Sequence, residues 1–290
     1  MGAGKRLLIL LLAALALPAA AVPSHQLCRL DQLTLCRHEL PSNWQQVLTQ
    51  LWPGELEQSV SQALAGQGGV TLLSEQDALI LLDPQSLQRQ HVILLGNQLI
   101  ERPPLRNFRS TYYHEIGHVA TRHSPWLEQL RQPLWPHHWA EEVLADLYLF
   151  WHLLREGAEA EELWMQVHLR NISLIQARPD WTHWTTPVTA PLLCDFKRLE
   201  FLAERPLEPF LDAVLSGSQD WPLSAYRRLG QRQFALTPPS VAQPYLAQPH
   251  RAHWAALLQP TFQWMGVDLE RYYGQQHLPV AASVCSVINE

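Results

Sequence analysis

The motif His-Glu-x-x-His, formed by His114, Glu115 and His118, carries the most specific chemistry in this sequence. On a helix, residues four apart project from the same face about 6 Å from each other, so both imidazoles can bind one metal ion. The glutamate between them lies beside that ion, where it can accept a proton from an attacking water. The motif therefore predicts a zinc site with Glu115 as general base, and metal-assisted hydrolysis as its chemistry.

The predicted zinc ion needs a third protein ligand, because a catalytic zinc usually has three and leaves the fourth position to water. In one extended form of the motif, a glycine and a further histidine follow three and six residues after the second histidine. Thr121 and Ser124 occupy these positions here. His123 misses the required position by one residue, which turns its side chain by about 100° on a helix. The third ligand is therefore expected farther along the chain.

A second amphipathic helix, downstream of the motif, carries a suitable acidic pair. Its apolar face is formed by Val143, Leu147, Phe150, Trp151 and Leu154. Glu142 and Asp146 share another face of this helix, four residues apart. We predict that Glu142 is the third ligand and that Asp146 accepts the free ring N–H of a ligating histidine, which fixes its tautomer. Glu141, His137 and His138 are the alternatives for the third ligand.

The two motifs together resemble the gluzincin group of zinc metallopeptidases, which includes the thermolysin-like enzymes. The likeness covers residues 111–146, and the remainder of the chain resembles no named family. It implies one Zn²⁺ per chain, a peptide or protein substrate, and two packed helices below a small sheet. It also implies that the edge strand of this sheet lines the substrate cleft, and we expect His91–Leu95 to form that strand.

Three functional hypotheses fit these motifs. The first is a metallopeptidase, in which Glu115 also delivers a proton to the leaving amine. The second is a non-catalytic zinc-binding envelope or interaction protein, or a degenerate peptidase, whose metal is closed by a fourth ligand from His123, His137 or His138. The third is a hydrolase of another amide, such as a cell-wall cross-link, because the same chemistry would serve it.

Other polar residues are expected to be mainly structural. His183 lies between Trp181 and Trp184, so we expect it to pack in an aromatic loop, with an oxyanion or substrate contact as the alternative. His168 lies on a predicted helix and is expected in the core. Asn171 begins a glycosylation sequon, which matters only in a host that glycosylates. The tryptophans are scattered along the sequence, which favours core packing over a ligand platform.

Hydrophobic periodicity predicts the elements that must position the site. Short apolar runs separated by turn-forming residues predict strands at Val70–Leu73, Ala78–Leu82 and His91–Leu95, and Asn97–Ile100 extends or pairs with the last of them. Two short helices are predicted before these strands, at Trp44–Gln50 and Gly54–Ala65.

From Thr111 onward the helical period dominates, and we expect Ser110 or Thr111 to cap the motif helix, Pro125 to end it, and Gly157 to end the second helix. The predicted fold class is α+β. It consists of a mostly helical zincin-like domain with a small sheet before the motif helix, and a helical C-terminal part.

The N-terminus has the pattern of an export signal. Lys5 and Arg6 precede the apolar run Leu7–Leu17, and three alanines at 19–21 offer a cleavage site. A membrane anchor is the alternative, but the run is about half the roughly 20 residues that cross a bilayer. We therefore predict a signal peptide over 1–21, no stable membrane insertion after its removal, and a periplasmic or secreted protein. The expected domains are a zincin-like metallopeptidase domain over 22–190 and a helical region over 191–290, which can belong to the same domain.

Charge and cysteine content agree with export and exclude some partners. The full chain has 21 basic and 27 acidic residues, and loss of the two basic signal residues leaves 19 against 27, a net charge of −8. This argues against nucleic-acid binding, which needs a cationic surface. An even number of cysteines in an exported chain predicts two disulfides. Of the three possible connectivities we favour Cys28–Cys36 with Cys194–Cys285.

Overall fold

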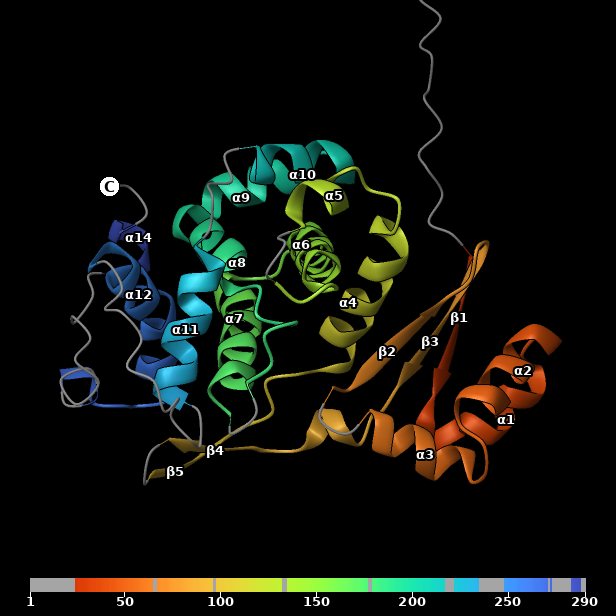
Figure 1. Cartoon of the computed structure of the whole chain (residues 1–290). Helices are drawn as coiled ribbons and strands as arrows, with labels where there is room; N and C mark the ends of the chain where they lie inside the picture. The colour runs from red at the N-terminus through yellow and green to blue at the C-terminus, as the bar shows by residue number, and fades with distance from the viewer. Residues whose placement is uncertain are drawn as a thin grey trace, which may run out of the picture.

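The computed structural model describes residues 24–64, 67–95, 98–131, 135–176, 179–216, 222–234, 248–270, 272 and 283–287. They form an α+β fold in which a small sheet with three helices on its outer face packs against a larger helical body (Figure 1). The predicted fold class is therefore confirmed. The predicted signal peptide lies outside the described residues, and the proposed domain limits stay predictions.

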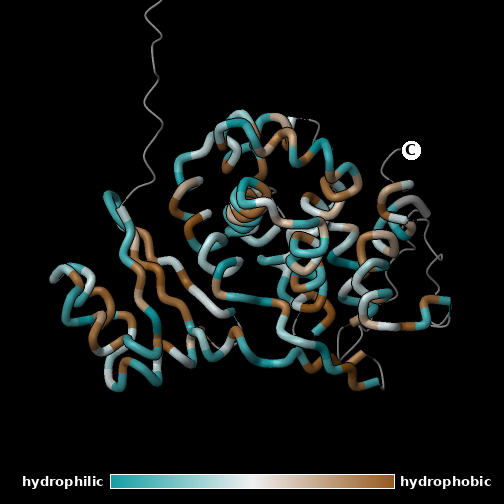
Figure 2. The backbone as a smooth tube through the Cα atoms, turned by 180° about the vertical axis from the view of Figure 1, so that it is seen from behind, coloured by the Kyte–Doolittle hydropathy of each residue, from teal (hydrophilic) through white to brown (hydrophobic). Residues whose placement is uncertain are grey.

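A three-stranded sheet forms the N-terminal part of the fold. Its strands are β1 (Ser24–Arg29), β2 (Gly69–Leu73) and β3 (Asp77–Leu82). The strand order is β1-β3-β2, with β1 parallel and β2 antiparallel to β3. The central strand β3 is hydrophobic along its length (Figure 2), because both of its faces are covered.

Helices cover the two faces of this sheet. The outer face packs on α1 (Leu33–Glu39), α2 (Ser42–Leu51) and α3 (Leu56–Ala63), through Leu79 and Leu81 of β3. The inner face packs on the helical body, through Ala78, Ile80 and Leu82. The alternation of side chains along β3 thus joins the two parts of the fold.

Two features of the sheet differ from the sequence prediction. β1 was not predicted, because it is an edge strand in which only Cys28 is buried, so it lacks an apolar alternation. His91–Leu95 (β4) does not join this sheet, since it pairs only with β5 (Gln98–Arg102) in a separate hairpin. The edge strand next to the motif helix is β2, and the expectation for His91–Leu95 was wrong.

The two predicted motif helices are present and cross closely. They are α4 (Phe108–Thr121) and α6 (Trp139–Arg155). At the crossing, a Cβ built on Gly117 would lie 2.7 Å from both Cα and the carbonyl oxygen of Ala145, so only glycine fits there. This close approach brings the histidines of α4 next to the acidic pair of α6.

The ends of these helices correct part of the prediction. Asn107 caps α4 by accepting a hydrogen bond from the backbone N–H of Ser110 at 2.7 Å, so Ser110 is the partner in the capping box and not the cap. The helix ends at Thr121, and Pro125 instead is the N-cap residue that precedes the next short helix. Gly157 follows the end of α6 with a φ of +79°, as expected of a helix-ending glycine.

The helical body surrounds α6, which Figure 1 shows nearly end-on. Its other helices are α5 (Trp126–Leu130), α7 (Ala160–Ile175), α8 (Thr186–Leu192), α9 (Phe196–Ala203), α10 (Leu207–Leu215), α11 (Leu223–Phe234), α12 (Gln248–Trp264) and α14 (Val284–Val287). One apolar cluster contains residues from before and after residue 190. No described helix combines the length and the hydropathy that crossing a bilayer requires.

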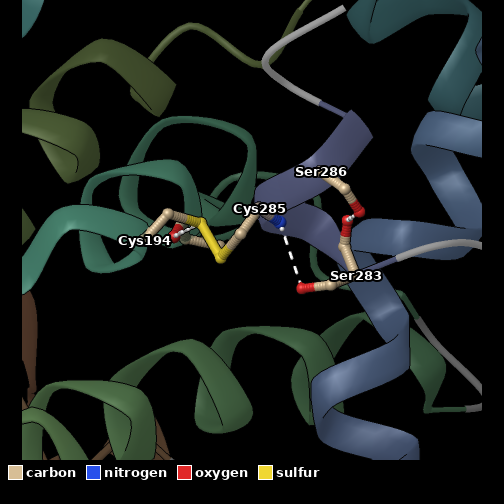
Figure 3. The surroundings of a disulfide bond; sticks show 5 residues. Cys194, Ser283, Cys285 and Ser286 are labelled. Atoms are coloured by element: carbon tan, nitrogen blue, oxygen red, sulfur yellow. Dashed lines mark hydrogen bonds between the residues drawn. A yellow bond between two sulfur atoms is a disulfide. The ribbon is translucent and has the colours of Figure 1, made fainter.

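Both favoured disulfides are present, so the predicted pairing is confirmed. Cys28–Cys36 joins β1 to α1, with the two Cα atoms 5.8 Å apart. Cys194–Cys285 joins the turn after α8 to α14, 91 residues later in the chain (Figure 3). Two such bonds are typical of a protein that folds in an oxidising compartment.

Candidate metal centre

Three predicted ligands meet between α4 and α6. His114 and His118 extend from α4, and Glu142 extends from the first turn of α6. The His114 Nε2 atom lies 3.2 Å from Glu142 Oε2, and the His118 Nε2 atom lies 3.6 Å from Glu142 Oε1. Two ligands of a tetrahedral zinc with bonds of about 2.1 Å are about 3.4 Å apart. The separations therefore match a metal site.

The environment of one buried Glu142 oxygen is suited to a cation. Glu142 Oε2 is inaccessible to solvent and receives no hydrogen bond from any described residue, although His114 Nε2 is near. A buried carboxylate oxygen without a hydrogen-bond donor is costly, so a positive charge close to it is favourable. Two imidazoles and a carboxylate are a typical donor set for zinc. The residues present thus fit one Zn²⁺.

Asp146 orients the first histidine. His114 donates from Nδ1 to Asp146 Oδ1 at 2.8 Å, which leaves its Nε2 lone pair directed at the ligand cluster. Arg170 donates to both oxygens of Asp146, at 2.8 Å from Nε and 2.5 Å from Nη2. The hydroxyl of Thr185 donates to Oδ2 at 2.5 Å. Asp146 therefore has partners on α4, on α7 and at the start of α8.

The electrostatics of the cluster favour a cation at its centre. Burial alone would raise the pKa of Glu142, but His118, His183 and His114 hold it well below its usual range. Burial and the charge of Arg170 lower the pKa of His114, yet the carboxylates of Asp146 and Glu142 outweigh both and raise it to about 9. A proton on His114 thus supplies part of the positive charge that a divalent cation would supply, and a cation bound there would displace it.

Asp146 and His118 show the same balance of burial and charge. Burial would raise the pKa of Asp146, but the charge of Arg170 and the bond from His114 keep it far below its usual value. Burial lowers the pKa of His118, so this imidazole is neutral and free to bind a metal at neutral pH.

Glu115 lies beside the ligands and is held by the edge strand. The Thr71 hydroxyl on β2 lies 2.7 Å from Glu115 Oε2 and 3.0 Å from the Glu115 carbonyl oxygen. A Cβ on Gly69, also in β2, would lie 2.8 Å from Glu115 Oε1. The strand therefore packs directly on this carboxylate, and both line one cleft.

His183 lies in the cleft, while its neighbours enter the core. Its Nδ1 atom bonds to Asp180 Oδ2 at 2.7 Å, and its Nε2 atom lies 3.4 Å from Glu142 Oε1. Trp181 and Trp184 instead join an aromatic cluster with rings that include Trp135 and Trp254. The loop between them thus turns one polar side chain toward the metal ligands, which its aromatic surroundings in the sequence do not indicate.

A cleft with a volume of about 420 Å³ is lined by the three candidate ligands, Glu115 and His183. Its walls come from β2, α4, the start of α6, α7 and the loop that carries His183. Arg106 and Arg170 also line it, and burial together with the charge of Arg170 lowers the pKa of Arg106 to about 10. Acids and two arginines therefore line the same cleft.

Several of these residues were missed at the level of sequence. Arg170 is a buried arginine on the largely apolar helix α7, and a lone charge at such a position was the available signal. Thr71, Asp180 and Thr185 are common residues in short segments, so nothing in their spacing marks them. The tryptophans, scattered along the chain, meet in space: Trp135, Trp139, Trp181, Trp184 and Trp254 form one cluster.

Other candidates lie elsewhere. His137, His138 and Glu141 form a second group of their own, separate from the one that contains Glu142. His168 is a core residue, as expected, whose Nδ1 atom bonds to the Thr261 hydroxyl at 3.0 Å. Asn171 is fully buried and donates to the Leu257 carbonyl, so its sequon is inaccessible in the folded protein.

Comparisons of the chain with protein-family models, with curated proteins and with solved structures give no match. The site therefore rests on its own geometry. That geometry is a group of two histidines and one glutamate, on two packed helices, which could hold a metal ion.

Proposed function

We propose that this chain is an exported zinc-dependent metallopeptidase that hydrolyses peptide bonds. The observation that carries the proposal is the spacing of the ligand atoms of His114, His118 and Glu142 in a cleft that also contains Glu115. The resemblance of residues 111–146 to gluzincin peptidases supports the choice of a peptide or protein as substrate. The two disulfides support an extracytoplasmic site of action, periplasmic or secreted.

Zn²⁺ bound by the two histidines and Glu142 supplies a Lewis acid, which lowers the pKa of water and polarises a carbonyl group. Glu115 takes the proton of the attacking water and then delivers a proton to the leaving amine. Thr71 holds one oxygen of the Glu115 carboxylate, which leaves the other oxygen for this transfer. The general base is thereby oriented before substrate binds.

Two further groups support this chemistry. Asp146 keeps His114 in the tautomer that offers Nε2 to the metal. His183, oriented by Asp180, is our candidate donor to the oxyanion of the tetrahedral intermediate, because its Nε2 atom lies next to the ligand cluster in the same cleft. A donor of this kind is commonly worth about 3 kcal/mol of transition-state stabilisation.

The proposal is tested with the mature chain, beginning near residue 22, and its Glu115→Gln variant. We expect one tightly held zinc in both proteins, because Glu115 is not a ligand. Peptide hydrolysis should fall by about 100-fold or more in the variant, since general acid–base catalysis contributes 10²–10⁴-fold. Glutamine keeps an oxygen that can accept the Thr71 hydrogen bond, so the fold should be unchanged.

An exposed acid provides the matched control. Glu101→Gln removes one negative charge outside the cleft and should leave hydrolysis at the wild-type rate. Equal hydrolysis by wild type and Glu115→Gln would refute the mechanism. A wild-type protein that holds zinc but hydrolyses no peptide would instead favour a zinc-binding interaction protein.

A further inference from the structure

A second group of metal-ligating side chains lies where α6 begins. His138 precedes the first residue of α6, and Glu141 lies in its first turn. His138 Nδ1 is 2.9 Å from Glu141 Oε2, and the rings of His137 and His138 are stacked with centroids 5.1 Å apart. One ligand atom from each of the three residues lies within 4.8 Å of the other two. His138 and Glu141 also line the cleft that contains the first site.

The spacing is close to that of a bound ion. Ligands of a tetrahedral zinc are about 3.4 Å apart, so no separation within this group has to shrink by more than about 1.4 Å. Both histidines are exposed and Glu141 is half-exposed, so rotation about side-chain bonds can supply this movement without displacing the backbone. Imidazole and carboxylate donors suit Zn²⁺, and they also suit Cu²⁺ and Ni²⁺.

The group is distinct from the first site. Its three members are not ligands of the buried cluster, although Glu141 and Glu142 are consecutive. The two acids differ in burial, because Glu142 points between α4 and α6 whereas Glu141 lies at the surface of the same turn. The N-terminal turn of α6 therefore presents one acid to each group.

We propose that His137, His138 and Glu141 bind a second divalent transition-metal ion, such as Zn²⁺, at the mouth of the cleft. This ion keeps water in its remaining positions, because three protein ligands leave a tetrahedral site open. Binding is weaker than at the buried site for two reasons. Exposed side chains lose more rotamer freedom when they bind the ion, and the surrounding solvent screens their attraction to it. The proposal does not depend on peptidase activity.

The test is a zinc titration of the tag-free mature protein by calorimetry and native mass spectrometry. Wild type should bind two equivalents, the second about tenfold more weakly or worse. The double substitution His137→Ala with His138→Ala should bind one. His123→Ala removes an exposed histidine outside both groups and should still bind two.

A second set of variants separates this proposal from the proposed function. His114→Ala with His118→Ala should lose the tight equivalent and keep the weak one. Glu141→Gln should weaken the second equivalent even if the histidine substitutions disturb folding, since it removes only a charge. A wild type that binds one zinc, or a His137→Ala/His138→Ala protein that still binds two, would overturn the second site and leave the first intact. A wild type that binds only the weak equivalent, which His137→Ala with His138→Ala then removes, would overturn the first site and leave the second intact.

Discussion

Gly117→Ala tests whether the contact between α4 and α6 sets the geometry of the metal centre. The new Cβ would lie 2.7 Å from two backbone atoms of Ala145 and 3.1 Å from a third. Backbone atoms cannot rotate away as a side chain can. Ordinary contact begins at 3.4 Å, so the helices must separate locally by about 0.7 Å.

This separation acts on the ligands directly. Gly117 adjoins His118 in the sequence, and Ala145 adjoins Asp146, which bonds to His114. Metal–ligand distances tolerate changes of about 0.2 Å, so a displacement several times larger should reduce zinc affinity by about 10- to 100-fold, as loss of a supporting group does. Overpacking costs about 1–3 kcal/mol, while the higher helix propensity of alanine returns at most about 1 kcal/mol. The variant should therefore also melt at a lower temperature.

The assay is a zinc competition titration with a chromogenic chelator, together with thermal unfolding of the metal-free protein. Gly157→Ala is the matched control, because its φ of +79° strains an alanine while nothing lies within 4 Å of the new Cβ. The control should lower the melting temperature and leave zinc affinity unchanged. If Gly117→Ala keeps both wild-type affinity and wild-type stability, the crossing does not set the site.

Two other predictions concern the edge strand and the core. Gly69→Ala places a Cβ 2.8 Å from Glu115 Oε1, so peptide hydrolysis should fall by about tenfold or more, while zinc content, measured by atomic absorption, stays at the wild-type level. Burial lowers the pKa of His168 from 6.5 to about 4. As the pH falls, His168 therefore becomes protonated in the unfolded chain before it does so in the folded chain. The free energy of unfolding, which keeps this contribution above pH 6.5, should decline by up to about 3 kcal/mol as the pH falls towards 4. Urea titrations at these pH values should show that His168→Gln removes this part of the decline in the free energy of unfolding. If the free energy of unfolding of the variant depends on pH as that of wild type does, the prediction is contradicted.

Local patterns in the sequence were sufficient to predict the group of His114, His118 and Glu142 that could hold a metal ion. His114, Glu115 and His118 are adjacent on one helix, and Glu142 and Asp146 share a face of the next, so helical geometry alone brings each set together. Pairing of the two sets required only that both helices bury their apolar sides. The disulfides were predictable because four cysteines allow few pairings.

The remaining parts of the site depend on contacts that no local pattern encodes. β2 and β4 are equally apolar runs, and what makes β2 the edge strand is its pairing with β3. Arg170 and Thr185 reach Asp146 from 24 and 39 residues away in the chain. Each is recognisable only after the helices have docked, because its role comes from a partner that is distant in sequence.

The position of Asp146 has a consequence for the order in which the parts of the candidate metal centre come together. All three candidate ligands, and Glu115, are present by the time the chain has reached the end of α6 at Arg155. The carboxylate that orients His114, however, is neutralised by Arg170 and bonded by Thr185, which belong to segments synthesised later. A fragment that stops after α6 would carry every candidate ligand, but Asp146 would keep only His114 and would lack Arg170 and Thr185. If the candidate centre binds metal as proposed, we expect binding to follow docking of α7 and α8, after the helical body has folded.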